Sequence, residues 1–150
     1  MSATLKDSIT EAMKNAMRAK DKERLGTIRL MLAEFKRIEV DERIEVDDAR
    51  GLVVLDKMVK QRRDSASQFS NANRKDLADK ELAEIAVIQE FMPSPFSEEE
   101  LSQLVSDAVA ESGASSAQDM GKVMAILKPK VQGRADMGQV GQLVKKSLSA

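Results

Sequence analysis

Basic side chains gather towards the carboxyl-terminal end of the sequence, in a pattern suited to binding phosphate groups. Between residues 120 and 150 Asp136 is the only acid, against six lysines and arginines. The six are Lys122, Lys128, Lys130, Arg134, Lys145 and Lys146. The whole chain has a formal charge of −1, so it has no general affinity for polyanions. The local excess therefore indicates a confined phosphate-binding face, and the first four residues are the main candidates.

Helix ends offer a second explanation for some of these cations. Four of them lie at predicted helix ends, namely Lys128, Lys130, Lys145 and Lys146. Positive charge there complements the helix dipole whatever the function. Lys122 falls instead in a first helical turn, where a cation is unfavourable by itself. Arg134 stands beside a helix N-terminus, whose free N–H groups form a ready anion site.

Glycines add to the case for a close contact in this region. Gly121, Gly138 and Gly141 lie within segments of helical periodicity, where each costs about 1 kcal/mol relative to alanine. Such small residues let something approach the backbone, either a neighbouring helix or the sugar-phosphate backbone of a nucleic acid. Gly133 is expected to end a helix in the left-handed conformation. With Gly121 it would allow a nucleic acid close to the chain.

A second basic cluster lies near the middle of the chain. It comprises Lys57, Lys60, Arg62 and Arg63. Asp56 and Asp64 stand four residues before and after Lys60, and such pairs stabilise an exposed helix face. We therefore expect this cluster to be a solvated ion-pair face first, and a binding site second.

The composition excludes most catalytic chemistry. With 0 His and 0 Cys, the chain has no imidazole base, no thiol nucleophile and no nitrogen or sulfur ligand for zinc. There is no phosphate-cradling glycine loop for ATP. With 0 Trp, 0 Tyr and four Phe, single-stranded RNA has no stacking platform. The sequence predicts no catalytic residue, no metal and no cofactor.

The apolar pattern predicts an all-α protein. Helical stripes cover 4–20, 21–41, 47–71, 74–91 and 98–112, and two more helices follow Ser116 and Asp136. Pro93 and Pro95 interrupt the pattern. They divide the chain into a four-helix N-terminal domain, 1–92, a linker, 93–96, and a three-helix tail domain, 97–150.

Several residues are expected to begin or end these helices. Thr4, Asp47, Ser97 and Asp136 are predicted N-caps. Asn73 with Asp76, and Ser116 with Asp119, are predicted to begin two others. Pro129 is expected to kink the sixth helix or end it a turn early, displacing Lys130.

No stretch is long and apolar enough to cross a membrane, and the chain opens directly into a charged helix. The sequence therefore predicts a cytosolic protein with no membrane partner.

Several segments resemble the GatB/YqeY family. In the tail these are Asp119-Met-Gly-Lys-Val-Met, Gly133-Arg-Ala-Asp and the final Val144-Lys-Lys-Ser-Leu. Upstream, Ile28-Arg-Leu-Met-Leu-Ala-Glu-Phe-Lys, Lys60-Gln-Arg-Arg-Asp-Ser and Phe91-Met-Pro-Ser-Pro-Phe are similar to recurrent blocks of the stand-alone members. The resemblance spans nearly the whole chain. The tail resembles the C-terminal domain of the GatB component of the aspartyl/glutamyl-tRNA amidotransferases.

This resemblance implies a role in translation, but it does not imply a particular catalytic activity. The family carries an amidotransferase or carbon–nitrogen ligase label, with glutamine as amido-nitrogen donor, but the catalytic parts of those enzymes lie outside the segments that this chain resembles. The tail domain is associated with holding tRNA. We therefore expect an accessory protein without catalysis of its own, which binds tRNA by shape and phosphate contacts. A synthetase or an amidotransferase is the expected protein partner. The alternative is a helical protein–protein interaction module with no nucleic-acid role.

Overall fold

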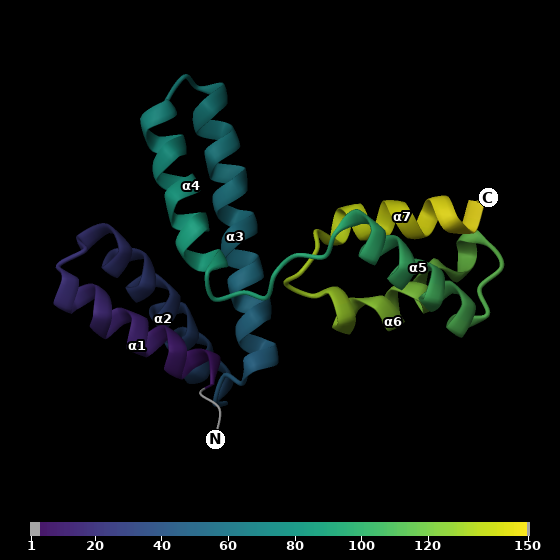
Figure 1. Cartoon of the computed structure of the whole chain (residues 1–150), viewed down its shortest axis with the longest axis horizontal. Helices are drawn as coiled ribbons and strands as arrows, with labels where there is room; N and C mark the ends of the chain where they lie inside the picture. Colours follow the sequence, from purple (N-terminus) through teal and green to yellow (C-terminus); the bar gives the residue numbers. More distant parts are fainter. Residues whose placement is uncertain (1–3, 150) are drawn as a thin grey trace. The chain divides into compact units, whose positions relative to one another are not determined.

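The computed structural model describes residues 4–149, and all regular elements in this part of the chain are helices (Figure 1). The elements are α1 (Leu5–Ala19), α2 (Lys22–Glu42), α3 (Asp48–Asn71), α4 (Lys75–Gln89), α5 (Glu98–Ser112), the 3₁₀ turn η1 (Ala117–Asp119), α6 (Met120–Val131) and α7 (Met137–Ser149). The all-α prediction is confirmed, since residues 4–149 contain seven α-helices and no strand. Within the same residues no helix combines the length and the apolar character needed to cross a membrane.

The chain divides into two compact units, a first unit that runs to Pro93 and a second unit that begins at Ser94. The first contains α1 to α4 and the second contains α5 to α7. The predicted domain limits, 1–92 and 97–150, remain predictions, and their outer ends at 1–3 and 150 lie outside the described residues.

Two helical hairpins, α1–α2 and α3–α4, build the first unit (Figure 1). Their buried faces share one core, in which Phe35 of α2 is 1% exposed. Gly51 lets the first turn of α3 pass against α2, because a Cβ there would lie 3.2 Å from the Phe35 ring. Burying a phenylalanine side chain such as that of Phe35 stabilises the fold by about 1.5–3 kcal/mol.

The outer part of the α3–α4 hairpin, from Arg62 through the connecting turn to Glu84, does not share the packing of the main core. Arg62 of α3 donates from Nε to Glu84 of α4 at 3.1 Å, and both side chains are less than one fifth exposed, at 15% and 17%. Beyond this ion pair Ala66 and Ala78 are buried, but neither belongs to the main core. The fully buried side chains in this part of the hairpin are thus two alanines, and Phe69 and Leu77 are half-buried.

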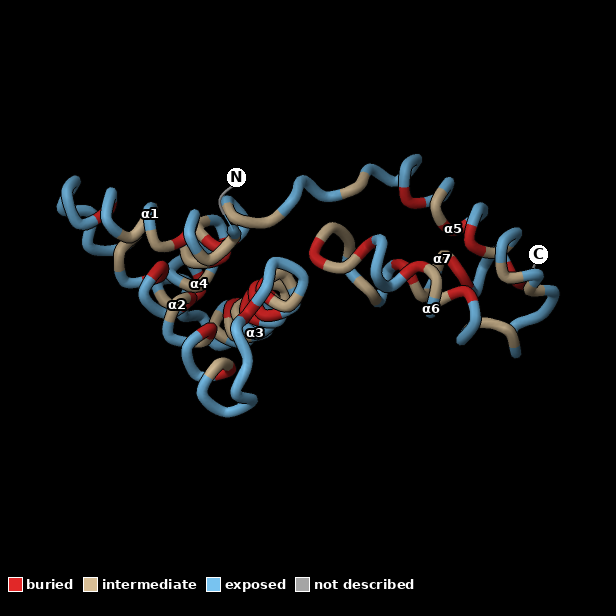
Figure 2. The backbone as a smooth tube through the Cα atoms, turned by 90° about the horizontal axis from the view of Figure 1, so that it is seen from below, coloured by how far each residue is buried: buried red, intermediate tan, exposed pale blue. Residues whose placement is uncertain are grey.

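The second unit has a separate core, shared by α5, α6 and α7 (Figure 2). Its fully buried side chains include Val123, Leu127 and Val131 of α6 and Val140 and Val144 of α7. Within each helix these residues repeat every four positions, so each helix buries one continuous stripe.

Most predicted caps are present. Thr4 and Ser97 form capping boxes with Asp7 and Glu100, respectively. The carboxylates of Asp47 and Asp136 accept backbone N–H groups at the starts of α3 and α7.

Two predicted helix starts are wrong. Arg74, not Asn73, is the N-cap of α4, because Asn73 adopts a left-handed conformation with φ of 60° in the tight turn after α3. Ser116 forms no side-chain cap, and the Asp119 carboxylate accepts the Ser115 N–H at 3.0 Å. Consequently the 3₁₀ turn η1 precedes α6, which begins at Met120.

The expectation that Pro129 ends α6 early is also wrong. The helix continues through Pro129 to Val131. Burial of Leu127 and Val131 on either side holds this last turn in place, and the missing N–H of proline removes only one hydrogen bond near the helix end. Lys130 therefore remains on α6.

Candidate nucleic-acid interface

The charges of the second unit are segregated by helix. α5 carries five acids and no base, while α6 and α7 carry five lysines and no acid. The five are Lys122, Lys128, Lys130, Lys145 and Lys146, and all are exposed. A unit with little net charge thus presents positive groups from two of its three helices, as the sequence predicts.

Carboxylates reach two of these lysines, and the contacts are loose. Lys122 lies 3.7 Å from Asp119, and Lys130 of α6 lies 3.8 Å from Glu111 of α5. Exposed pairs of this kind contribute about 0–1 kcal/mol and are screened by salt. Lys128, Lys145 and Lys146 form no salt bridge with any described residue. A phosphate group could therefore displace the two weak partners.

The lysines of α6 do not share one face. At about 100° per residue, Lys122 and Lys128 lie about 120° apart around the helix, on the two borders of its exposed side. Lys130 lies on the border next to α5, beside Glu111. Lys122 and Lys128 thus border the exposed side of α6, and we call them the flanking pair; Lys130 lies beyond Lys122, about 80° further around the helix.

Small residues fill the surface between the flanking pair. Gly121, Ala125 and Pro129 follow one another at intervals of four, and all three are exposed. A Cβ added at Gly121 would meet nothing within 4 Å, so no neighbouring helix explains this glycine. We call these three residues the α6 ridge. Sequence reasoning singled out Gly121 and missed Ala125 and Pro129, although the i, i+4, i+8 spacing of small residues was visible.

The other glycines of the second unit have reasons within the protein. A Cβ at Gly141 of α7 would contact the Met120 side chain at 3.5 Å, and one at Gly138 would lie 3.2 Å from the Asp136 carboxylate. Gly133 has φ of +77° and ends α6 as predicted. For these positions, contacts and backbone conformation inside the unit explain the small side chain.

Arg134 is built into the corner between α6 and α7. Its Nε donates to the Ser94 carbonyl at 2.8 Å, and its guanidinium carbon lies 3.7 Å from the centre of the Phe96 ring. Its own carbonyl accepts the Phe96 N–H at 2.9 Å. Arg134 therefore fastens the segment 94–96 to the second unit, a role that the sequence did not suggest because the partners lie about 40 residues away.

The second basic cluster is largely engaged within the first unit. Lys60 lies 3.3 Å from Asp56, as its spacing predicts, and Arg62 is held by Glu84. Arg63 is exposed and forms no salt bridge within residues 4–149. The cluster thus does not form one free cationic surface.

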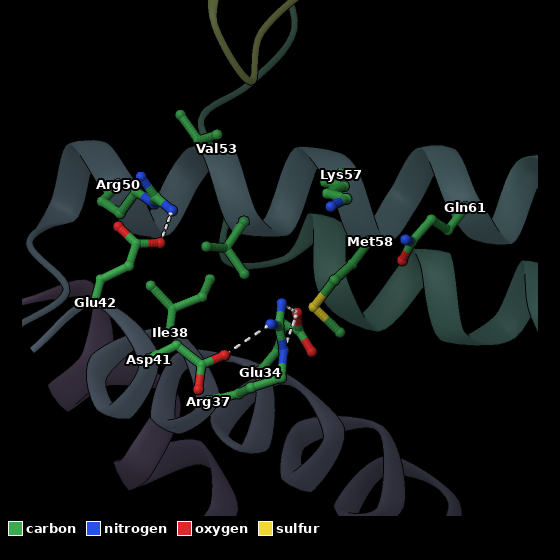
Figure 3. A pocket seen from close by; sticks show the side chains of 11 residues that line it. Glu34, Arg37, Ile38, Asp41, Glu42, Arg50, Val53, Lys57, Met58 and Gln61 are labelled. Carbon is green, nitrogen blue, oxygen red and sulfur yellow. Dashed lines mark hydrogen bonds and ion pairs between the residues drawn. The ribbon is translucent and has the colours of Figure 1, made fainter.

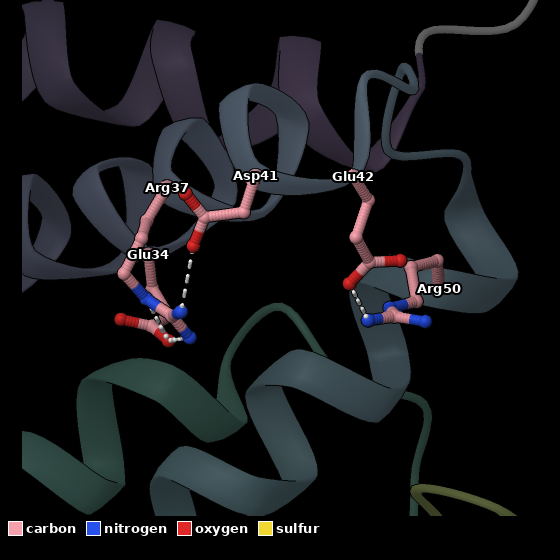
Figure 4. A network of polar contacts seen from close by, with 5 residues as sticks. All are labelled: Glu34, Arg37, Asp41, Glu42 and Arg50. Atoms are coloured by element: carbon pink, nitrogen blue, oxygen red, sulfur yellow. Dashed lines mark hydrogen bonds and ion pairs between the residues drawn. The ribbon is translucent and has the colours of Figure 1, made fainter.

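Lys57, the remaining member, lines a groove between α2 and α3 with a volume of about 240 Å³ (Figure 3). On the α2 side Arg37 contacts both Glu34 and Asp41, and Glu42 pairs across the groove with Arg50 of α3 at 2.5 Å (Figure 4). The hydrogen bond from Arg37 lowers the pKa of Glu34. Three acids and three bases line the groove, so their charges balance and it has no net attraction for an anion.

Two carboxylates of the second unit also have lowered pKa values. The Ser115 N–H is the main cause for Asp119, and the Ser97 N–H is the main cause for Glu100. Both carboxylates stabilise local backbone, which is a structural task. No group of three or more acidic side chains within residues 4–149 is arranged to hold a metal ion.

A family described as Yqey-like proteins matches residues 6–148. The chain belongs to this family. The match covers nearly all of this YqeY-like chain, so both units and the α6 ridge lie within it.

The YqeY-like chain is also similar to individual proteins. It is 34% identical over 122 residues to a protein of Pyrenophora tritici-repentis named Altered inheritance of mitochondria protein 41, mitochondrial, which covers 77% of this chain and 67% of that protein. Proteins with the same name from Vanderwaltozyma polyspora and Eremothecium gossypii are 39% identical over 83 and 85 residues, which cover 55% and 56% of this chain and 45% and 46% of theirs. The chain thus spans about two thirds of the first relative and about half of the other two.

These names contradict the predicted cytosolic location, because they describe the relatives as mitochondrial. The prediction relied on the lack of an apolar leader. That criterion does not separate the cytosol from mitochondria, because mitochondrial transit segments are amphipathic and rich in arginine.

Proposed function

We propose that this YqeY-like protein is a tRNA-binding accessory protein that contacts folded tRNA through α6 of its second unit. The α6 ridge carries the proposal. A surface of Gly121, Ala125 and Pro129 would let a sugar-phosphate backbone approach the helix, and Lys122 and Lys128 on its borders would each meet a phosphate. Phosphate contacts of this kind fix a protein on RNA without reading bases.

The surrounding groups have graded roles in this proposal. Lys145 and Lys146 add to the positive field from α7, and Lys130 contributes least because it lies outside the flanking pair, on the side of α6 next to α5. Arg134 shapes the corner, where its Nε donates to the Ser94 carbonyl and its guanidinium lies over the Phe96 ring, so its role in this proposal is structural. We place the protein beside the glutamine-dependent tRNA amidotransferases or an aminoacyl-tRNA synthetase, as a partner that binds the tRNA and leaves the chemistry to the enzyme.

A titration of fluorescently labelled total tRNA would test the proposal at about 50 and 200 mM salt. Because each lost phosphate contact lowers the salt slope by about 1, the double variant Lys122→Glu with Lys128→Glu should bind at least about tenfold more weakly and with a smaller slope. Lys57→Glu with Arg63→Glu is the matched control, since both residues are exposed cations of the first unit. The control should bind nearly as the native protein does.

Two results would count against the proposal. Absence of tRNA binding at low salt would remove the nucleic-acid role and favour the protein-interaction alternative. Equal losses in the two double variants would show that binding follows net charge and not the α6 ridge.

A further inference from the structure

The α1–α2 hairpin has a patterned surface on its solvent side, at the border of the faces that it buries in the core. On α1, Lys6, Met13 and Met17 follow one another at intervals of seven and four residues, so they lie on one side of the helix. On α2, Leu25 and Leu32 are seven residues apart and are both half-buried. Each helix therefore carries a partly apolar stripe that the core does not fully cover.

An ion pair shows that the two stripes meet. Lys6 Nζ of α1 lies 2.8 Å from the Glu39 carboxylate of α2, and Glu39 stands two turns after Leu32. Because α1 and α2 are antiparallel neighbours (Figure 1), the stripes run along the line where the two helices touch. We call this surface the hairpin seam, and it consists of Lys6, Met13, Lys14 and Met17 of α1 with Lys22, Leu25, Arg29, Leu32, Lys36 and Glu39 of α2.

The floor of the hairpin seam is apolar. Met13, Leu25 and Leu32 contact the core with one side and keep their outward side uncovered. Met17 is 50% exposed, which is high for a large apolar side chain. Methionine side chains are flexible and adapt to the shape of a partner. The floor can therefore receive another apolar surface.

Basic side chains border this floor on both helices. The seam contains five bases and one acid, Glu39, which Lys6 already holds. The other four bases are exposed and form no salt bridge within residues 4–149, namely Lys14 on α1 and Lys22, Arg29 and Lys36 on α2. The hairpin seam thus has positive charge on both sides and no free carboxylate of its own.

The positive excess remains when the adjoining residues are counted. On the α2 side these are uncharged: Gly26, Ala33 and Val40. On the α1 side and in the turn before α2 they are Asp7, Glu11, Arg18, Lys20 and Asp21, which bring the total to seven bases and four acids. The three added acids are engaged, since Asp7 completes a capping box, Asp21 caps α2 and Glu11 lies 3.8 Å from Arg18.

We propose that the hairpin seam docks an acidic amphipathic helix of a partner protein. The apolar stripe of that helix would rest on the methionines and leucines of the floor, and Asp or Glu on its two flanks would meet the bases of α1 and α2. From Lys6 to Met17 the seam runs for about 17 Å, enough for about three turns of a docked helix. Such docking uses apolar anchors at i, i+3 or i+4, and i+7.

The recessed floor favours a helix over other polyanionic surfaces. A phosphate backbone would meet the bases but would gain nothing from the apolar floor. A helix that enters a bilayer presents its apolar face outermost, whereas Met13, Leu25 and Leu32 are half-buried between two helices. The side chains of a third helix can reach such a floor, because helices pack by inserting ridges into grooves.

A synthetic acidic helix can serve as the probe in a test with the full-length chain. We would use a fluorescein-labelled Leu/Glu peptide of about 14 residues, patterned as an amphipathic helix that forms on docking, and an otherwise identical Leu/Lys peptide. Fluorescence anisotropy should show binding of the Leu/Glu peptide and weaker binding, by about tenfold or more, of the Leu/Lys peptide.

Charge variants locate the binding on the first unit. Arg29→Glu with Lys36→Glu should weaken binding of the Leu/Glu peptide by about tenfold or more. Lys57→Glu with Arg63→Glu is the matched control, because it changes the net charge equally and also replaces two cations that form no salt bridge within residues 4–149. The control should bind the peptide within about twofold of the native chain.

A crossed measurement separates this site from tRNA binding by the second unit. Lys122→Glu with Lys128→Glu should lose affinity for tRNA and keep its affinity for the Leu/Glu peptide. Arg29→Glu with Lys36→Glu should lose the peptide and keep tRNA. The two proposals can therefore fail separately.

An apolar variant tests whether the floor takes part. Met17→Ser should weaken binding of the Leu/Glu peptide by about three- to fivefold. Leu82→Ser is the matched control, because Leu82 is 52% exposed on α4, outside the hairpin seam. It should bind the peptide as the native chain does, and circular dichroism would verify that both variants keep their helicity.

Three outcomes would overturn the proposal. One is failure of the Leu/Glu peptide to bind better than the Leu/Lys peptide, and another is an equal loss in the two double variants of the first unit. The third is full binding by Met17→Ser, because the seam would then attract polyanions by charge alone. If Arg29→Glu with Lys36→Glu also lost tRNA in that case, the seam would be a nucleic-acid contact.

Discussion

The two basic clusters of this protein differ in what their cations contact. On α3 Lys60 lies 3.3 Å from Asp56 and Arg62 donates to the largely buried Glu84 at 3.1 Å, whereas Lys57 and Arg63 form no salt bridge within residues 4–149. On α6 and α7 the lysines are exposed, and among residues 4–149 only two of them have a carboxylate within 4 Å. A run of basic residues therefore does not identify a binding surface until the acids on neighbouring helices are known. The following predictions test this contrast, from the largest expected effect to the smallest.

Removing a paired cation should cost far more stability than removing a free one. Arg62→Ala leaves Glu84 largely buried without its partner, and we expect a loss of roughly 2 kcal/mol in the free energy of unfolding. Lys128→Ala should change it by less than about 0.5 kcal/mol. Urea unfolding followed by circular dichroism would measure both, and similar losses would remove the distinction between the clusters.

Glycines of the two units should respond to alanine with opposite signs. At Gly51 a Cβ would lie 2.8 Å from Leu5 and 3.2 Å from the buried Phe35 ring, so Gly51→Ala should destabilise the first unit by about 1–2 kcal/mol. At Gly121 the space is open, and Gly121→Ala should stabilise α6 by about 1 kcal/mol. Thermal unfolding of each variant checks the signs. Destabilisation by Gly121→Ala would show that this glycine has a structural role after all.

Arg134 should behave as a structural residue although it belongs to the predicted cationic group. Arg134→Lys keeps the charge but loses the planar contact with Phe96 and the hydrogen bond to Ser94, at a cost of roughly 1 kcal/mol in stability. At a temperature where the variant is folded, tRNA affinity should be nearly unchanged. A large loss of affinity with native stability would instead make Arg134 a direct contact.

Acid should weaken the second unit through two carboxylates that accept backbone N–H groups. Folding lowers the pKa values of Glu100 and Asp119, so their contribution to stability is complete above the unfolded-state pKa values. It is lost as the pH falls through the lower, folded-state values, in the range between about pH 5 and pH 1. Glu100→Gln keeps the capping hydrogen bond without titrating, so its melting temperature should fall less steeply with acid. An unchanged slope would assign the acid sensitivity to other groups.

Local signals accounted for most of the fold. The stripes of α1 to α7 and the caps at Thr4, Ser97 and Asp136 involve residues within four positions, where spacing alone determines which groups meet. The predicted helix starts at Asn73 and Ser116 were wrong because another local backbone conformation formed at each place. Asn73 is left-handed in the turn after α3, and the 3₁₀ turn η1 follows Ser116. Pro129 shows the reverse case, in which tertiary burial overrides a local helix breaker.

The candidate site was predictable only in part, for a related reason. The excess of cations between residues 120 and 150 can be counted in the sequence, and the structure exposes the five lysines of α6 and α7. Which cations stay free depends on partners such as Glu111 for Lys130 and Ser94 for Arg134, which lie about 20 and 40 residues away. Such pairings follow from how helices pack, and no spacing rule in the sequence gives them.

The Arg62–Glu84 pair has a consequence for how the first unit opens. On the side of the pair away from the turn that joins the two helices, α3 and α4 contribute to the main core; towards the turn the buried side chains are Ala66 and Ala78, and Phe69 and Leu77 are half-buried. So little apolar burial holds the outer hairpin that its amides should exchange with deuterium through local opening, well before the whole unit unfolds. This end of the hairpin is the part of the first unit that can fray and reform while the rest stays folded.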